Sequence, residues 1–283
     1  MTQSTISLTA FRPDHLEGAL RLSRQAGWPH RLEDWQLALD LSAGVVALDT
    51  DASTVVGTIL MTPYKRDVAT VNMVIVDESA RGRGLGRRLM EAIIEQAGLR
   101  VLRLVATGEG LPLYQKLGFH RTGTIIQHQG TALPVAAPAN VRPAGSHDVF
   151  DVLELDRSAF GADRRCLLRT LAEVGQLAVL DHGRGITGFA ASRAFGRGEV
   201  IGPVVAANVD DGKALLSFFM ARSEGRFVRV DTAEASQLSA WLSEQGLVQV
   251  GDGIAMQRPV AVQSSPSTST TFTTFALASQ AFG

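Results

Sequence analysis

Residues 71–96, VNMVIVDESARGRGLGRRLMEAIIEQ, join a strand pattern to a helix pattern through a turn rich in arginine and glycine. Residues 71–76 are mostly β-branched, which is typical of a strand, and from Leu85 onward apolar residues recur at helical spacing. The turn itself, residues 81–86, reads RGRGLG. Its glycines let the backbone approach a ligand closely, and the helix start leaves N–H groups unpaired. The sequence therefore predicts an anion-binding turn.

The spacing of the glycines limits which anion this turn can bind. A dinucleotide site needs G-x-G-x-x-G, whereas Gly82, Gly84 and Gly86 give G-x-G-x-G, and a P-loop needs a following lysine that is absent here. The remaining pattern, Arg81-x-x-Gly84-x-Gly86 between a strand and a helix, resembles the coenzyme A pyrophosphate loop of the GNAT (general N-acetyltransferase) superfamily. The alternative is an ordinary strand-to-helix turn.

A second motif supports the same resemblance. Residues 101–106 (VLRLVA) form another strand pattern, and residues 111–119 (LPLYQKLGF) follow; they resemble the next strand of the family and its A-x-x-L-Y-x-K-x-G-F segment. The resemblance gives Tyr114 the role of general acid toward the departing coenzyme A thiolate. A phenol (pKa about 10) and a thiol (about 8.5) exchange a proton readily. The alternative is a packed aromatic residue, and Thr107 departs from the asparagine common in the family.

The resemblance also implies which residues bind each substrate. The acceptor side would include Trp28 and His30, from the segment between the first two helices, and Asn72, where the family has a bulge. Trp35, at helical spacing, fits ordinary packing. The general base stays open among four residues: His30, Glu33, Asp34 and Glu109. The expected coenzyme-binding residues lie on the strand, the turn and the next strand end: Val74, Ile75, Val76, Arg81, Gly82, Arg83, Gly84, Leu85, Gly86, Arg87 and Thr107.

Composition narrows the class of protein. A chain of 283 residues suffices for two domains, and 45% hydrophobic with 19% charged residues is typical of a soluble globular protein. A net charge of −1 argues against a nucleic-acid partner. Cys166 is the one cysteine, so no intrachain disulfide forms; we expect it to be buried, and no metal site is indicated. Without a signal or a membrane-span pattern, a cytoplasmic location is expected.

The second half of the chain repeats landmarks of the first. Arg142-Pro143 follows Arg12-Pro13, and two further glycine-containing pairs recur, all at offsets of 128 to 131 residues. The first half reads as strand, two helices, three antiparallel strands, helix, strand, helix. We therefore expect an α/β fold of two GNAT-like lobes, each a mostly antiparallel sheet flanked by helices. The expected domains are residues 1–130 (catalytic), 131–140 (a Pro/Ala linker) and 141–283 (degenerate).

The second lobe is expected to be inactive. Residues 185–192 and 199–205 read as its strands and residues 214–221 as its central helix. The turn before that helix lacks arginine, Asp210 and Asp211 would repel a pyrophosphate, and Leu242 stands at the tyrosine position. Residues 263–274 are rich in Ser and Thr, yet residues 272–278 are apolar enough to pair with or cover this lobe.

The resemblance implies an N-acetyltransferase that moves an acetyl group from acetyl-CoA, its cosubstrate, to a primary amine within a ternary complex. A small, partly apolar amine is expected as the acceptor, with no nucleic-acid or membrane partner. A polypeptide N-terminus or lysine is a weaker alternative for the acceptor. A sensor that binds acyl-CoA without turnover is the alternative from another class. The sequence leaves the oligomeric state open between monomer and homodimer.

Overall fold

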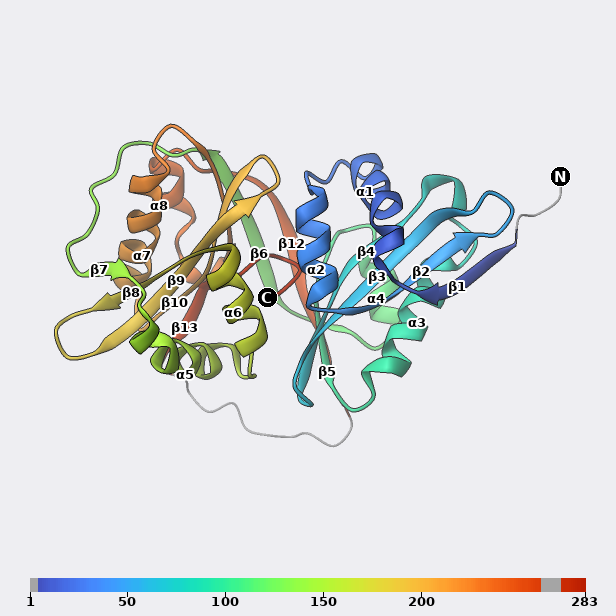
Figure 1. Cartoon of the computed structure of the whole chain (residues 1–283), viewed down its shortest axis with the longest axis horizontal. Helices are drawn as coiled ribbons and strands as arrows, with labels where there is room; N and C mark the ends of the chain where they lie inside the picture. The colour runs from blue at the N-terminus through green and yellow to red at the C-terminus, as the bar shows by residue number, and fades with distance from the viewer. Residues whose placement is uncertain (1–4, 261–270) are drawn as a thin grey trace.

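The computed structural model describes residues 5–260 and 271–283. They form two lobes that lie side by side, the first half of the chain in one and most of the second half in the other (Figure 1). Within the described residues, thirteen strands build one sheet that continues from lobe to lobe, in the order β1-β2-β3-β4-β5-β12-β6-β11-β13-β10-β9-β8-β7. The expected α/β class is confirmed, with the two sheets joined into one.

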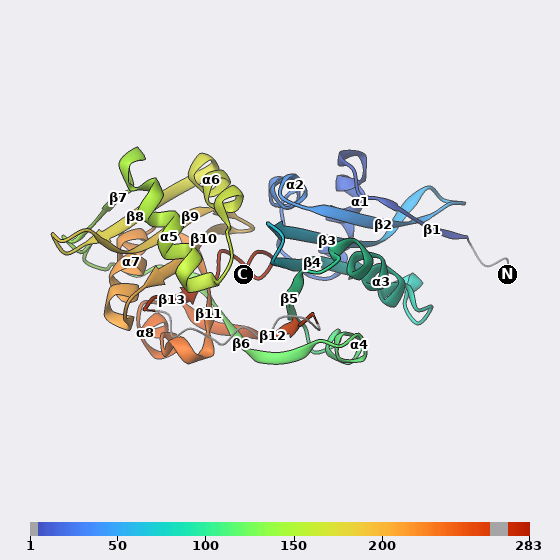
Figure 2. The same ribbon diagram turned by 90° about the horizontal axis from the view of Figure 1, so that it is seen from below.

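The first lobe has the element order that the sequence predicts. Its elements are β1 (Ile6–Ala10), α1 (Leu16–Gln25), α2 (Leu32–Asp40), β2 (Ala43–Asp49), β3 (Thr54–Tyr64), β4 (Val68–Val76), α3 (Leu85–Ala97), β5 (Val101–Ala106), α4 (Leu111–Lys116) and β6 (His120–Thr131). Alternation along β3 turns Leu60 toward α1 and α2 and its neighbour Ile59 toward α3. Helices therefore cover both faces of the sheet (Figure 2).

The second lobe repeats this plan. Its elements are β7 (Val141–Pro143), α5 (Val149–Phe160), α6 (Arg165–Val174), β8 (Gly175–Asp181), β9 (Ile186–Phe195), β10 (Gly198–Ala206), α7 (Val209–Arg222), β11 (Phe227–Ala233), α8 (Ser239–Glu244), β12 (Val248–Arg258) and β13 (Thr273–Ala276). The strand predicted at 185–192 corresponds to β9, which begins at Ile186, and the ranges predicted at 199–205 and 214–221 lie in β10 and α7, so these three predictions are confirmed.

One strand crosses between the lobes. β12 comes late in the chain, yet it pairs antiparallel with β5 and β6 of the first lobe; Ile254 lies opposite Ala106 on one side and Thr124 on the other. β6 in turn pairs with β11 of the second lobe, where His128 lies opposite Val230. The proposed domains, 1–130, 131–140 and 141–283, follow the repeat in the chain, while the sheet joins them.

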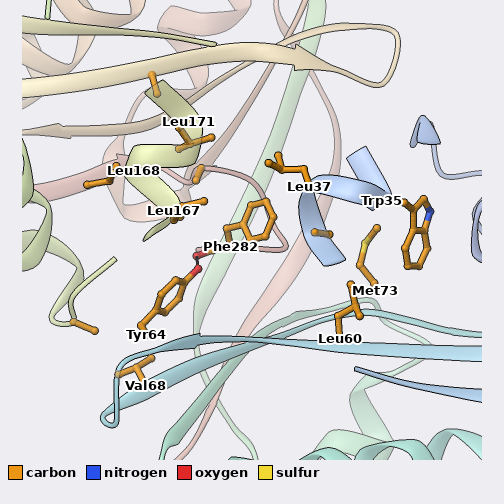
Figure 3. Packing of buried hydrophobic residues seen from close by; sticks show 14 of the residues in the cluster. Trp35, Leu37, Leu60, Tyr64, Val68, Met73, Leu167, Leu168, Leu171 and Phe282 are labelled. Carbon is orange, nitrogen blue, oxygen red and sulfur yellow. Dashed lines mark hydrogen bonds between the residues drawn. The ribbon is translucent and has the colours of Figure 1, made fainter. Parts of the chain in front are cut away.

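A continuous apolar core also joins the lobes. Figure 3 shows Leu37 of α2 and Leu167 of α6, from opposite lobes, in one cluster of buried side chains. At its edge the Tyr64 hydroxyl on β3 donates a hydrogen bond to the backbone oxygen of Phe282 over 2.6 Å. Arg103 on β5 donates to the backbone oxygen of Phe160 over 2.9 Å. These contacts hold the two lobes against each other, and so they fix the walls of the cavity that lies between the lobes.

Two further expectations concern single features. Cys166 is exposed, so its expected burial is wrong: it lies on the outer face of α6, whose buried face carries Leu167, Leu168 and Leu171. The apolar stretch 272–278 does return to the second lobe as β13, whereas the Ser/Thr-rich residues 263–270 lie outside the described residues.

Among the helices described, none is long and apolar enough to cross a membrane.

Candidate active site

β4 carries a bulge on the side where the site forms. Its register with β3 steps from Ile75 opposite Thr58 to Asn72 opposite Leu60, so Met73 and Val74 lie opposite one residue of β3. Met73 has a φ of 51°, rare for a side chain of its kind. The Thr58 hydroxyl donates to the backbone oxygen of Met73 over 2.8 Å and holds this geometry. The bulge that the family resemblance implied at residues 72–74 is therefore present.

Beside the bulge the sheet opens. The parallel strands β4 and β5 pair only at their beginning, from Val68 with Val101 to Thr70 with Arg103. β5 stays paired with β12 as far as Ala106, so the gap between β4 and β5 widens toward the end of β4. Val74, Ile75 and Val76 lie along this gap and line a groove there.

The glycine-rich turn closes one end of that groove. Gly82 and Gly84 have φ values of 74° and 73°, which L side chains rarely adopt, and a Cβ at either position would meet nothing within 4 Å. Gly84 is the N-cap of α3, whose first turn holds no acidic residue. N–H groups at this helix start and the positive end of its dipole therefore face the groove. Arg81, Leu85, Gly86 and Arg87 line the same groove.

The arginines of the turn point in different directions. Arg81 lies 4.0 Å from the exposed Glu109 carboxylate across the groove. Arg87 donates to Glu91 over 2.7 Å, one helical turn on. Arg83 lines a separate hollow beside Ile6 and Arg88. The structure thus brings Arg81 and Arg87 to the groove, and it places Arg83 outside that groove lining.

Tyr114 lies where the groove meets a second space. It is buried on α4, and burial raises the pKa of Tyr114 to about 12. Its hydroxyl makes no hydrogen bond to any residue that the structure describes, and Gly110, the N-cap of α4, leaves room for its ring. Thr107, at the end of β5, lines both spaces and donates no side-chain bond to the groove; its Oγ1 accepts from the Gly110 N–H.

The second space is a cavity of about 630 Å³ between the lobes. The first lobe contributes α2, β4 and β5, and the second contributes β9, β11 and the C-terminal residues 279–282. Four residues line both the groove and the cavity: Trp28, Val74, Thr107 and Tyr114. A molecule in the cavity can therefore reach the end of a molecule in the groove at Tyr114.

Trp28 and His30 form the wall of the cavity on the side of α1 and α2. The His30 ring packs edge-on against Trp28, Trp35 and Phe195, at centroid distances of 5.5, 6.2 and 5.6 Å. Its Nδ1 lies 3.1 Å from the Ser23 hydroxyl, which accepts a bond from Trp35 Nε1. Burial lowers the pKa of His30 to about 4 against the attraction of the Asp34 carboxylate, so the ring is neutral at neutral pH.

The other general-base candidates do not suit that role. Glu33 and Glu109 are exposed and do not line the cavity. Asp34 does line it, but its oxygens accept bonds from Arg31, Arg193 and the N–H of Gly196. Burial alone would raise the pKa of Asp34; the hydrogen bonds from Arg31 and from the Gly196 N–H hold that pKa below the usual range, so the carboxylate stays ionised and its oxygens already have donors.

Asn72 lines the cavity and carries an unsatisfied buried atom. Its side chain is buried, and Nδ2 donates to Thr62 Oγ1 over 3.0 Å. Oδ1 is buried and has no hydrogen-bond partner among the described residues. An amide oxygen in this state can accept a hydrogen bond from a ligand. The structure therefore places all three predicted acceptor-side residues, Trp28, His30 and Asn72, on one cavity.

The half of the cavity that the second lobe supplies was not predicted from the sequence. Arg193 on β9 and Arg229 on β11 line it, and so do Ser279 and Gln280 near the C-terminus. Arg193 does leave a signal, because it is a lone charge in the apolar stretch that forms β9. Its direction toward the first lobe depends on how the lobes pack, which the local pattern does not contain.

The equivalent gap in the second lobe is closed. β10 and β11 also pair in parallel only at their beginning, at Glu199 and Val200. Where they separate, β13 fills the space: Ala276 lies opposite Val204 on β10 and opposite Thr232 on β11. At the start of α7, the Asn208 side chain already caps the N–H of Asp211. The chain's own strand therefore occupies the position that stays open in the first lobe.

An open gap beside a bulged strand, facing a glycine-capped helix start, defines the class of GNAT-type acyltransferases. Two models of an acetyltransferase (GNAT) domain match this chain, one over residues 42–121 and the other over residues 152–268. A Bacillus subtilis (strain 168) protein described as the uncharacterized N-acetyltransferase YitH is 28% identical over 246 residues, which cover 84% of this chain and 86% of that protein.

Solved structures agree on the fold. A candidate acetyltransferase of Pyrococcus horikoshii superposes with a TM-score of 0.80 at 18% identity, covering 100% of this chain and 98% of that one. A tandem GNAT protein from the clavulanic acid biosynthesis pathway gives 0.64 at 16% identity, covering 93% and 100%. The chain belongs to the GNAT superfamily and is a two-lobed acyltransferase of that family. GNAT proteins generally use acetyl-CoA.

Proposed function

We propose that this protein transfers the acetyl group of acetyl-CoA directly to the primary amine of a small molecule, with both substrates bound together. The observation that carries the proposal is the meeting of groove and cavity. Trp28, Val74, Thr107 and Tyr114 line both, so a donor in the groove and an acceptor in the cavity would meet beside the Tyr114 hydroxyl. Separate spaces that meet at one acid suit direct transfer better than a relay through the protein.

The groove has the features that a coenzyme A pyrophosphate requires. Gly82 and Gly84 leave open space where side chains would otherwise stand, and the start of α3 offers N–H groups and a positive dipole end. Arg81 and Arg87 add positive charge at its edge. The open edge of β4 from Val74 to Val76 would pair with the amides of the pantetheine arm, as a strand adds to a sheet.

In the proposed reaction, the neutral amine nitrogen forms a bond to the thioester carbonyl carbon. The carbon–sulfur bond then breaks, and its electron pair stays on sulfur. Tyr114 donates its proton to that sulfur, and the proton released by the amine restores the phenol, so one proton passes overall from nitrogen to sulfur. Because burial raises the pKa of Tyr114 to about 12, the phenol is protonated at neutral pH and ready to donate.

The shape of the cavity favours a small acceptor. Its volume is about 630 Å³, and both lobes and residues 279–282 line it. The packed core that includes Leu37 and Leu167 fixes these walls. A polypeptide N-terminus or lysine would have to enter between them, which makes a free small molecule the better fit.

The test is Tyr114→Phe, assayed by thiol release with a panel of amines. We expect kcat to fall by about 10²- to 10⁴-fold, since general acid catalysis contributes that much, while the affinity for acetyl-CoA by calorimetry stays the same. Tyr64→Phe is the matched control, because Tyr64 is the other of the two tyrosines and bonds the backbone of Phe282 between the lobes. A sensor of acyl-CoA would bind the coenzyme and release no thiol with any amine.

A further inference from the structure

The charges around the cavity between the lobes are not balanced. Arg193, Arg197 and Arg229 from the second lobe line it, against Asp34 from the first lobe and Asp252. Arg197 and Asp252 are exposed, so water screens both of them. The buried part of the cluster therefore decides which ligand charge the cavity favours.

Two carboxylates in this cluster form ion pairs with arginines other than Arg193. Arg31 holds Asp34 with two side-chain bonds of 2.9 and 3.1 Å, and its backbone N–H adds a third. Arg229 holds the buried Asp231 through Nε and Nη2 at 3.0 to 3.1 Å. Each of these pairs is charge-neutral. Arg193 is left with a longer contact of 3.3 Å to Asp34, so the cluster keeps about one positive charge in excess.

Arg193 is also short of hydrogen bonds. Its side chain is 4% exposed. Nη1 donates to Asp34 and to the backbone oxygen of Ala194 at 3.3 and 3.2 Å, whereas Nε is buried without a partner among the described residues. Burial lowers the pKa of Arg193 to about 10, and the guanidinium still carries its charge at neutral pH. A buried cation with incomplete partners is costly unless an anion completes the site.

Neighbouring groups fit an anion at the same place. The guanidinium carbons of Arg193 and Arg229 lie 5.0 and 5.2 Å from the centroid of the Phe195 ring, so both cations meet the same aromatic ring. Ser279 lines the cavity, and its hydroxyl is buried without a partner among the described residues. A hydroxyl can donate to an anionic oxygen beside the arginine fork.

We propose that the acceptor amine carries an anionic oxygen group, a carboxylate or a phosphate, which pairs with Arg193 of the second lobe. This inference rests on the proposed acetyl transfer at Tyr114 and specifies its substrate class. The amine end would lie toward Tyr114 and the anionic end toward β9. The second lobe, whose own groove β13 fills, then selects the acceptor for the first.

A matched series of amines tests this with the full chain. Thiol release from acetyl-CoA is measured with 4-aminobutyrate, 4-aminobutyramide and butylamine, and with the pair phosphoethanolamine and ethanolamine. We expect kcat/KM for an anionic amine to exceed that of its neutral-tail partner by at least about tenfold, because a guanidinium–oxyanion pair discriminates by that much or more. A higher kcat/KM for 4-aminobutyrate than for phosphoethanolamine would identify the anionic group as a carboxylate, and the reverse order would identify it as a phosphate.

Arg193→Gln then assigns the selectivity to one residue. We expect kcat/KM for the preferred anionic amine to fall by about 100-fold and that for its neutral partner to change less than about threefold, with unchanged acetyl-CoA affinity. Arg222→Gln removes a comparable charge from α7, where Arg222 lies over the Phe218 ring outside the cavity. If Arg193→Gln fails to fold, the amine series on the unaltered protein still decides.

Each outcome bears on one of the two proposals. Equal or better use of the neutral-tail amines, or an equal loss for all amines in Arg193→Gln, would overturn the anionic acceptor while leaving acetyl transfer intact. Coenzyme binding without thiol release for any amine would overturn acetyl transfer, and the anionic acceptor with it. Selectivity for anionic amines that Arg193→Gln abolishes would support both.

Discussion

Gly110 lies beneath the ring of Tyr114, where a Cβ atom would stand 2.7 Å from Cε2 of the tyrosine. Real Cβ atoms do not approach other atoms so closely. The φ of Gly110 is −78°, which any residue can adopt, so space and not backbone freedom requires glycine here. The N-cap of α4 therefore sets the position of the proposed acid.

Gly110→Ala is expected to displace the phenol without removing it. A shift of the acid by a fraction of an ångström to 1 Å is expected to lower kcat by about 10- to 100-fold. Gly110 also lines the groove, but a methyl group there would meet the Tyr114 ring and not the start of α3, so acetyl-CoA affinity should change little. The matched control is Gly108→Ala, where a Cβ would meet nothing within 4 Å. Equal kcat values for the two variants would show that the ring position does not limit turnover.

The turn before α3 makes a prediction about binding. Gly84 has a φ of 73°, and Gly225, in the second lobe, has 72°; neither would bring a Cβ within 4 Å of another atom. Alanine at either position should therefore cost about 1 kcal/mol of unfolding free energy through backbone strain alone. Only Gly84→Ala should also weaken acetyl-CoA binding, by about tenfold, because its strain distorts the start of the helix.

Urea unfolding and calorimetry separate the two effects. Matching losses of stability with weaker binding only in Gly84→Ala would assign the turn to the coenzyme. Weaker binding in both variants would instead trace the effect to stability.

The stoichiometry of coenzyme binding depends on β13. Because β13 pairs with β10 and β11 where those strands separate, the second lobe offers no open strand edge at this point. We expect one acetyl-CoA per chain by calorimetry, and none for the Arg81→Glu, Gly84→Asp double variant, which puts negative charge at the start of α3. Two per chain would contradict the reading of β13 as a strand that closes the second site.

Local structure could be predicted from the sequence. The strand, turn and helix of residues 71–96 could be predicted because strand alternation, glycine geometry and helical spacing act within a few residues, and the internal repeat revealed the second lobe. The bulge at Met73 leaves no glycine and came only from the resemblance. The burial predicted for Cys166 failed because its flanking leucines turn inward on α6 while it faces out.

The features that could not be predicted from the sequence depend on contacts between residues far apart in the chain. The place of β12 between β5 and β6 depends on which sheet edges are open once both lobes have formed, and hydrophobic alternation fits either lobe equally well. Likewise, Arg193 reads as a charge in an apolar strand, while its contact with Asp34 joins residues 159 positions apart. The groove beside β4 and the first lobe's share of the cavity were thus predictable from motifs and the family resemblance, and the second lobe's share was not.

His30 is expected to make the stability of the protein depend on pH. Its folded pKa of about 4 lies below the usual 6.5, mainly because the ring is buried, with Arg193 and Arg229 also opposing its charge and Asp34 favouring it. Between these two values the unfolded chain binds more protons, so stability is fully present above about pH 6.5 and falls as the pH drops toward 4. The full shift corresponds to about 3 kcal/mol.

His30→Gln keeps a polar side chain and removes this titration. We expect its free energy of unfolding to fall less than that of the unaltered protein between pH 6.5 and 4.5, measured by urea unfolding at each pH. Burial lowers the pKa of His128 as well, so His128→Gln is the matched control and should flatten the curve by its own, separate amount. A curve for His30→Gln as steep as that of the unaltered protein would mean that His30 is protonated normally, and so that the wall formed by Trp28, Trp35 and Phe195 is open to water.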